Sequence, residues 1–234
     1  MIFQFKQFSV KQAQSAMKIG TDSVLLGAWT PLEQPQSILD IGAGTGLLAL
    51  MLAQRSDAMT IDAMEIDESA YIECTENFEA SPWGDRLFCY HASFEEFFTE
   101  MDEPYDLIIS NPPFYPTDYK TPEKARNTAR FSDALPPEQL LEGVNRLLAV
   151  EGKFSVILPY TESESFITLA ATFGLFPQQI THTRGNAQSE LKRSMMLFAR
   201  TPQPSYPTHI LTIEKERGVY TEAYKALTKE FYLK

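Results

Sequence analysis

The pattern of apolar positions from residue 37 onward alternates short continuous apolar runs with longer stretches that repeat at helical spacing. Short runs rich in β-branched residues are typical of buried strands, whereas a period near 3.6 residues is typical of amphipathic helices. The runs predict strands at 37–41, 60–66, 87–91, 105–110 and 153–159. The periodic stretches predict helices at 47–55, 69–80, 93–98 and 164–174, and between Pro136 and Gly152. Because strands that alternate with helices pair in parallel, we predict a doubly wound α/β fold.

The last third of the chain breaks this alternation. Three strand candidates, 176–184, 194–200 and 208–214, follow one another with no predicted helix between them. Strands in such a series favour antiparallel pairing, so we expect an antiparallel edge on a mostly parallel sheet. A helix predicted at 221–234 ends the chain. We expect one domain over residues 1–234, in which 1–36 form an N-terminal extension of an α/β core at 37–234.

Composition places the chain among ordinary globular proteins. Of its 234 residues, 44% are hydrophobic. Because it has neither a signal-peptide pattern nor an apolar run of about 18 residues, we expect a cytoplasmic protein that does not span a membrane. Cys74 and Cys89 have the spacing of neither a metal site nor a redox pair, and the three histidines lie far apart in the sequence. We therefore expect no bound metal and no disulfide.

The net charge of −11 argues against a general nucleic-acid coat protein, because phosphate binding depends on Lys and Arg. The acidic residues are concentrated, however: from Asp62 to Asp106 there are 14 acids and one base, Arg86. Three other segments are basic, namely 1–20, 118–131 and 183–200. Both a basic face built from these segments and a scatter of solvated side chains are consistent with this distribution.

The first predicted strand continues into the glycine-rich sequence DIGAGTG, Asp40 to Gly46. Glycines allow a ligand to approach the main chain closely. The dinucleotide-binding pattern G-x-G-x-x-G fails, because Leu47 stands where its last glycine would be. The loop instead resembles motif I of the S-adenosylmethionine-dependent methyltransferases. That resemblance assigns S-adenosylmethionine as the cofactor and Asp40, Gly42, Ala43, Gly44 and Gly46 to its binding.

The ends of the next two predicted strands carry further candidates for this cofactor. Glu65, followed by Ile66, can accept two hydrogen bonds from a ribose diol, or it can cap the helix that follows. After the third strand come Ala92 and Ser93, where the superfamily often has an acidic residue that meets the adenine amino group. Ser93 can accept a hydrogen bond from that amine or can cap its own helix, and the sequence leaves both open.

The fourth predicted strand ends in SNPPFY, residues 110–115. The Asn-Pro-Pro-Phe segment resembles motif IV of methyltransferases that modify a planar exocyclic or amide nitrogen. Such a nitrogen is a poor nucleophile, and two acceptors, the side-chain oxygen of Asn111 and the carbonyl of Pro112, would hold it in line with the methyl group. Pro113 stiffens this segment, and Phe114 offers a face on which a base can stack. Asn111 also borders the expected cofactor site.

This motif alone leaves several substrates open. Adenine N6 in nucleic acid, the glutamine amide of a protein and guanine N2 in ribosomal RNA all present such a nitrogen. A non-catalytic S-adenosylmethionine-binding scaffold is the alternative from another class of protein.

The N-terminal segment narrows the choice. FKQF, AMKIGTD and LLGAW, together with DIGAGTG, NFEASPW, SNPPF and EFYL, resemble the bacterial tRNA(Val) (adenine-37-N6)-methyltransferase family over most of the chain. This resemblance implies a Rossmann-like sheet of seven strands and methyl transfer to N6 of adenine 37, next to the anticodon. It implies that Thr21 and Asp22 lie near the methionine end of the cofactor, although Asp22 can also be a helix N-cap.

The same resemblance names tRNA, through its anticodon stem-loop, as the partner; the sequence indicates no obligate protein partner. Unpaired bases of such a loop can be splayed out, with the target flipped into the pocket. The basic segments then supply candidates for phosphate contacts, which are Lys6, Lys11, Lys120, Lys124, Arg126, Arg130, Lys192 and Arg193.

Overall fold

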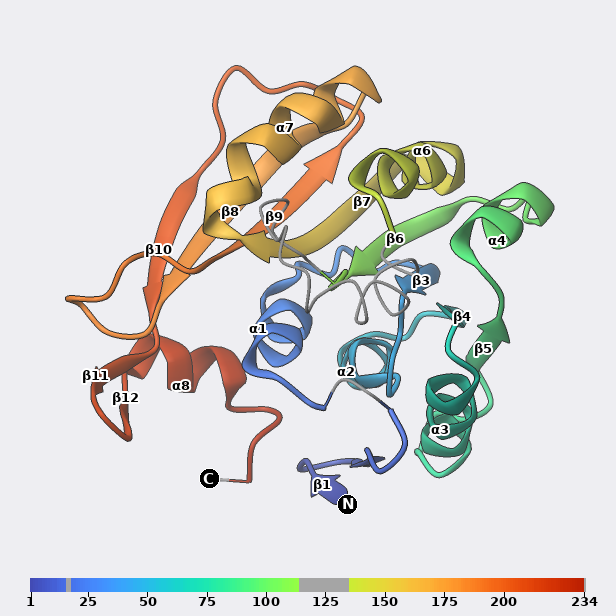
Figure 1. Ribbon diagram of the computed structural model, residues 1–234, viewed down its shortest axis with the longest axis horizontal. Helices are drawn as coiled ribbons and strands as arrows, with labels where there is room; N and C mark the ends of the chain where they lie inside the picture. Colours follow the sequence, from blue (N-terminus) through green and yellow to red (C-terminus); the bar gives the residue numbers. More distant parts are fainter. Residues whose placement is uncertain (16–17, 114–134, 234) are drawn as a thin grey trace, which may run out of the picture.

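The predicted alternation of strands and helices is present in a computed structural model of the chain (Figure 1), which describes residues 1–15, 18–113 and 135–233. Its largest element is a sheet with the strand order β10-β8-β9-β7-β6-β3-β4-β5. The strands are β3 (Ser37–Ile41), β4 (Thr60–Glu65), β5 (Leu87–His91), β6 (Tyr105–Ser110), β7 (Leu148–Pro159), β8 (Phe176–Arg184), β9 (Arg193–Ala199) and β10 (Thr208–Thr212). The predicted α/β class is therefore confirmed.

The sheet is parallel from β5 through β4, β3 and β6 to β7. β9 is antiparallel to both of its neighbours, β7 and β8, whereas β10 is parallel to β8. The prediction of seven strands is wrong, because the sheet formed by the described residues has eight. Of the three strands expected to form an antiparallel edge, β9 alone runs opposite to the rest of this sheet. β9 ends beside the start of β8. A strand that continues from there along the far side of β8 must run in the same direction as β8.

Helices cover both faces of the sheet. α1 (Thr21–Trp29), α2 (Leu47–Arg55), α3 (Glu68–Glu79) and α8 (Glu222–Thr228) form the lower group in Figure 1, and α4 (Phe94–Glu100), α6 (Pro137–Leu147) and α7 (Ser163–Thr172) form the upper group. Each group buries its own apolar cluster against the sheet. Ile109 of β6 belongs to the cluster with Leu50 of α2, and its neighbour Ile108 belongs to the cluster with Leu141 of α6. Alternate residues of one strand thus pack on opposite faces of the sheet. Because both faces are buried, the strands are apolar almost throughout.

The boundary between α6 and β7 differs from the prediction. β7 begins at Leu148 rather than at residue 153, so Gly152 lies inside the strand and not beyond the end of a helix. A Cβ on Gly152 would lie 2.9 Å from the carbonyl oxygen of Tyr105. The absence of a side chain on Gly152 therefore allows β7 to lie close to β6. This contact is next to an irregularity in the register of the two strands, between Tyr105 and Leu107.

Both ends of the chain add small hairpins, β1 (Ile2–Gln4) with β2 (Ser9–Lys11) and β11 (Glu214–Glu216) with β12 (Val219–Tyr220). Phe5, between β1 and β2, is fully buried in the same cluster as α1 and α2, and the backbone N–H of Lys6 donates to the carbonyl of Phe231 at 2.9 Å. From these contacts we propose that residues 1–36 and the α/β core form one domain.

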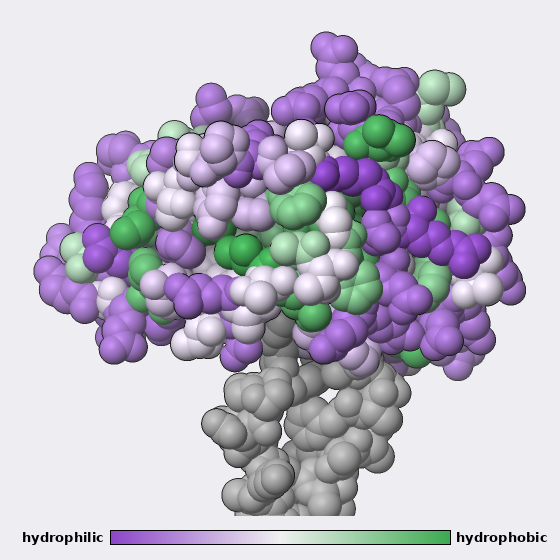
Figure 2. Space-filling model, turned by 90° about the horizontal axis from the view of Figure 1, so that it is seen from above, coloured by the Kyte–Doolittle hydropathy of each residue, from purple (hydrophilic) through white to green (hydrophobic). Residues whose placement is uncertain are grey.

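The surface seen from above (Figure 2) has apolar and neutral residues in its middle and hydrophilic residues along its sides. Within the described residues, no helix has the length and apolar character needed to cross a membrane.

Candidate functional site

The site begins where the strand order reverses. From β3 the chain adds β4 and β5 on one side, and it then returns to add β6 on the other side of β3. In α/β sheets, ligands bind outside the carboxyl ends of the strands at such a point. Ile41 of β3 pairs with Ser110 of β6. The glycine loop at 42–46 and the Asn-Pro-Pro segment at 111–113 therefore leave the sheet side by side.

Three glycines determine the path of the loop. Gly42, Gly44 and Gly46 have φ angles of 73°, 56° and 78°, in the left-handed region that residues with a Cβ rarely adopt. A Cβ on Gly42 or Gly44 would meet no atom of the described residues within 4 Å, whereas one on Gly46 would lie 2.5 Å from the ring of Phe78. The first two glycines thus border open space, and the third allows α2 to begin against α3.

Two buried carboxylates lie beneath the loop. Glu65 accepts hydrogen bonds from the backbone N–H groups of Gly44 and Asp67, both at 2.8 Å. The alternative that Glu65 caps α3 is wrong, because Asp67 is the N-cap and accepts from Ala70 N. Asp40 is fully buried. Burial raises the pKa of its carboxyl to about 7; the N–H of Ala49, 3.2 Å from Oδ2, opposes this rise, and the charge of Glu65 adds to it.

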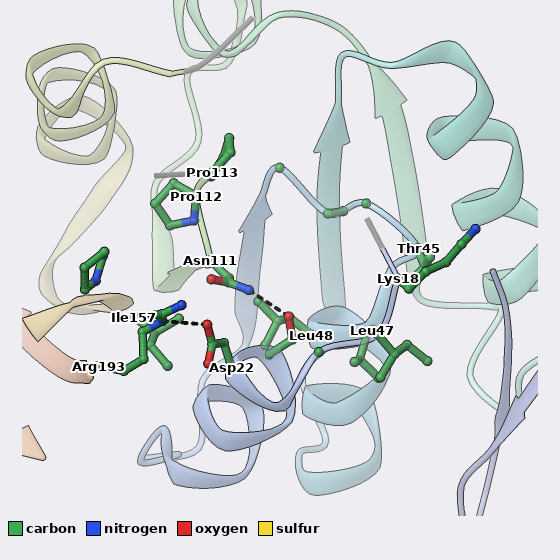
Figure 3. Close-up of a pocket in the computed structure, with 17 residues that line it drawn as sticks. Lys18, Asp22, Thr45, Leu47, Leu48, Asn111, Pro112, Pro113, Ile157 and Arg193 are labelled. Atoms are coloured by element: carbon green, nitrogen blue, oxygen red, sulfur yellow. Dashed lines mark hydrogen bonds and ion pairs between the residues drawn. The ribbon is translucent and has the colours of Figure 1, made fainter. Parts of the chain in front are cut away.

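A cavity of about 290 Å³ lies between the glycine loop, the start of α1 and the Asn-Pro-Pro segment (Figure 3). Asn111, Pro112 and Pro113 line it, and Asn111 Nδ2 donates to Ser23 Oγ at 2.8 Å. This bond fixes the orientation of the amide, so that Oδ1 is the atom left to accept from a ligand. The sequence pattern did not identify Ser23, because the two residues are 88 positions apart and meet only in the folded chain.

The N-terminal side of the cavity differs from the prediction in one detail. Gly20, not Asp22, is the N-cap of α1, and no side chain bonds to the cap. Asp22 lies inside the first turn, where its carboxylate accepts from Arg193 Nε of β9 at 2.7 Å. Both residues line the cavity, and the ion pair between them joins α1 to β9 (Figure 3).

The structure places the residues predicted for the cofactor in different positions around the cavity and the sheet. Those that line the cavity are Asp22, Gly42, Ala43, Gly44 and Asn111. Asp40, Gly46 and Glu65 support the loop, and Thr21 begins α1. Ile66 and Ala92 follow the ends of β4 and β5. Ser93 is the N-cap of α4, in a reciprocal capping box with Glu96. The capping role of Ser93 is thus confirmed, and its contact with an adenine stays a prediction.

The residues predicted to contact RNA are dispersed. Phe114, Lys120, Lys124, Arg126 and Arg130 lie outside the described residues. On the N-terminal hairpin, Lys6 donates to the carbonyl of Lys229, and Lys11 forms an ion pair with Glu76 at 3.0 Å. Of the predicted residues that the structure describes, Lys192 and Arg193 lie beside the cavity, because Arg193 lines it and Lys192 is exposed next to it.

Known proteins match this chain over its whole length. The family model for the methyltransferase small domain matches residues 9–172. The tRNA1(Val) (adenine(37)-N6)-methyltransferase of Flavobacterium psychrophilum is 58% identical over 234 residues, with 100% of both chains covered. The protein of the same name from Photorhabdus laumondii subsp. laumondii is 40% identical and covers 99% of this chain and 95% of its own.

Solved structures share the fold at low sequence identity. A methyltransferase from Pyrococcus furiosus has a TM-score of 0.61 at 18% identity and covers 82% of this chain and 89% of its own. A predicted O-methyltransferase from Agrobacterium tumefaciens has a TM-score of 0.66 at 17% identity, with 90% and 96% covered.

The fold, the glycine loop and the family match define the class: a Rossmann-like methyltransferase whose methyl donor is S-adenosylmethionine. Within that class, the chain belongs to the tRNA1(Val) (adenine(37)-N6)-methyltransferase family. The family resemblance expected from the sequence is therefore confirmed.

The residues present fit this cofactor. The open space over Gly42 and Gly44 allows close approach of a ligand to the main chain. Oδ1 of the buried Asp40 has no hydrogen-bond partner in the part of the chain that the structure describes. S-adenosylmethionine has a sulfonium cation, an amino group and ribose hydroxyls. Carboxylates and accessible backbone groups are suitable partners for such groups.

Proposed function

We propose that this enzyme methylates the exocyclic N6 of adenine 37 in the anticodon loop of tRNA1(Val). We also propose that the enzyme acts in the cytoplasm, since this is where a substrate of this kind is available. The observation that supports methyl transfer to a planar nitrogen is the orientation of Asn111, whose side chain is fixed by Ser23 at the edge of the same cavity that the glycine loop borders. The alternatives of glutamine, guanine or a scaffold role are not favoured, since full-length relatives from 40% to 58% identity carry the same adenine-N6 name.

The cofactor would be held by the glycine loop and the residues beneath it. Gly42 and Gly44 offer an open main chain, and Glu65, which already fixes Gly44, keeps lone pairs that can accept from a ribose hydroxyl. When bound, S-adenosylmethionine supplies an electrophilic methyl group.

The chain's own groups then position the target amine. Asn111 Oδ1 accepts a hydrogen bond from one N–H of the adenine amino group, and the carbonyl oxygen of Pro112 accepts a hydrogen bond from the other N–H. Two acceptors favour the tetrahedral nitrogen of the transition state over the planar nitrogen of the free base, which lowers the barrier selectively. The Ser23 bond and the two prolines hold these acceptors in place before the substrate arrives, so little order has to be gained during the reaction.

The test is methyl transfer from labelled S-adenosylmethionine to separate pools of tRNA, ribosomal RNA, DNA and protein, followed by mass spectrometry of the labelled pool. We expect N6-methyladenosine in tRNA alone. Asn111→Ala should reduce turnover at least a hundredfold, because an acceptor used in the transition state is lost, while calorimetry should show a much smaller change in cofactor affinity. Label as methylglutamine in protein or as N2-methylguanosine in ribosomal RNA would overturn the proposed substrate.

A further inference from the structure

An exposed aromatic residue follows directly on a residue that lines the cavity. Pro159, the last residue of β7, lines the cavity, and Tyr160 follows it at the start of a short 3₁₀ turn, η2 (Tyr160–Glu162). Tyr160 is 40% exposed. The mechanism proposed above uses neither Tyr160 nor the residues that hold it.

The ring of Tyr160 is fixed from one side. It packs edge-to-face against His182 of β8, with ring centroids 4.9 Å apart and an interplanar angle of 90°. His182 Nδ1 is 2.8 Å from Ser194 Oγ of β9, and Ser194 is fully buried. The backbone N–H of Tyr160 donates to the carbonyl of Lys192 at 3.0 Å. A ring already held in this way loses little freedom when a partner covers its exposed side.

Two cationic residues adjoin the turn that holds this ring, and the exposed Glu162 lies in the same turn. Lys192 is exposed, and Arg193 lines the cavity while it pairs with Asp22. Burial lowers the pKa of His182, so the imidazole beneath the ring is neutral at pH 7 and adds no charge of its own. An aromatic face beside cationic side chains is the composition of sites for unpaired nucleotides, where the ring stacks on a base and the cations meet the phosphates.

We propose that Tyr160 stacks on the base that neighbours the target adenine, and that Tyr160 and Lys192 together form a subsite for this flanking nucleotide outside the methyl-transfer cavity. The proposal rests on the proposed function, since it needs an RNA substrate whose target base enters the cavity. An unpaired loop provides such a neighbour, because flipping of the target leaves the adjacent base free to restack on protein.

The experiment measures binding of a full-length tRNA1(Val) transcript to the full chain and to three variants. Tyr160→Ala should bind about tenfold more weakly, the loss expected for one stacked base. Tyr160→Phe keeps the ring and should bind within about twofold of the unchanged protein. Tyr206→Ala is the matched control, because Tyr206 is 36% exposed and precedes β10 at the sheet edge away from the cavity. It should bind normally, and all variants should keep their affinity for S-adenosylmethionine.

A second set of transcripts identifies the stacked base. Each has an abasic site on the 5′ or the 3′ side of the target adenine. The tenfold effect of Tyr160→Ala should disappear with one of the two, because the interaction that the variant removes is already absent. Normal tRNA binding by Tyr160→Ala, or an equal effect with both abasic transcripts, would overturn the stacking proposal. Failure of the unchanged protein to methylate the intact transcript would instead overturn the proposed function.

Discussion

At the scale of single residues, Asp40 has the most unusual environment. It is fully buried, one carboxylate oxygen accepts from Ala49 N, and burial raises its pKa to about 7. In an unfolded chain an aspartate titrates near pH 4. The folded chain therefore binds this proton more tightly than the unfolded chain does. The stabilising contribution of the group is complete below about pH 4, decreases as the pH rises toward 7, and is lost above that value.

Asp40→Asn should remove this pH dependence, since an amide of the same shape has no proton to lose. We expect the free energy of unfolding of the variant, relative to that of the unchanged protein, to be about 1 to 2 kcal/mol larger at pH 8 than at pH 5.5, because only the unchanged protein loses stability over this range. Urea unfolding without cofactor at the two pH values measures the difference. Asp57→Asn, at an exposed position, is the control for the substitution. An equal effect of Asp40→Asn at both pH values would show that Asp40 stays ionised in the folded chain.

Single residues also show which parts of the candidate site the sequence indicates. Asn111, Gly42 and Gly44 line the cavity, as their specific chemistry and their short spacing to a strand end indicate, and their contacts with cofactor and substrate stay predictions. Ser23 and the Asp22–Arg193 ion pair were not predicted. Each depends on a contact between segments at least 88 positions apart, and a serine or an ion pair carries no local signal of its partner.

At the scale of elements, one carboxylate anchors the N-terminal segment that borders the cavity. Glu73 of α3 accepts backbone hydrogen bonds from Ala13 at 2.5 Å, Gln14 at 3.2 Å and Ser15 at 2.9 Å. Burial by itself raises the pKa of Glu73, but these three N–H groups and the charge of Lys18 outweigh it, so the pKa is lowered. Lys18 in turn donates to the carbonyl of Ser15 at 3.0 Å and lines the cavity.

Glu73→Ala should therefore affect both stability and cofactor binding. Loss of an ionised acceptor leaves three backbone donors without their partner, which should lower the free energy of unfolding by about 2 to 3 kcal/mol. The segment up to Lys18 would also be less ordered at the cavity, and we expect about tenfold weaker S-adenosylmethionine binding by calorimetry. Glu76→Ala, one turn away and paired with Lys11 at the surface, should change neither quantity measurably. Equal effects of the two variants would contradict the anchoring role.

Element boundaries were predictable where one pattern acts alone. The limits of α2, β5, β6 and β8 agree with the prediction. For α2 and β6 the reason is a nearly continuous apolar run between polar or glycine residues. β7 was predicted to start too late, since Leu148 and the residues after it continue the apolar pattern of α6 and only pairing with Tyr105 of β6 makes them a strand. The hairpin of β1 and β2 was not predicted, because each strand has three residues and Phe5 is buried by tertiary packing.

At the scale of the whole molecule, the net charge of −11 should repel an RNA substrate, so the location of the positive charges matters. Several arginines bind backbone carbonyls of the protein instead of facing a partner. Arg55 donates to Gly27 and Thr30, and Arg86 donates to Ala53, Ser56 and Ala58, where they complete the ends of α1 and α2. RNA binding should therefore depend mainly on the cations beside the cavity. The acidic remainder of the surface disfavours the binding of RNA phosphates at other places.

A double substitution tests this distribution of charge. Lys192→Ala with Arg193→Ala should weaken tRNA binding about tenfold near 50 mM salt, and should lower the slope of log K against log salt by about 1 to 2, since each phosphate contact contributes about 0.7 to 0.9. Binding measured at several salt concentrations gives this slope. Lys215→Ala with Lys225→Ala removes the same charge from the region of α8, where both lysines pair with Glu222, and it should leave the slope unchanged. If both double variants lowered the slope equally, net charge alone would govern RNA binding and the location of the cations beside the cavity would have no role.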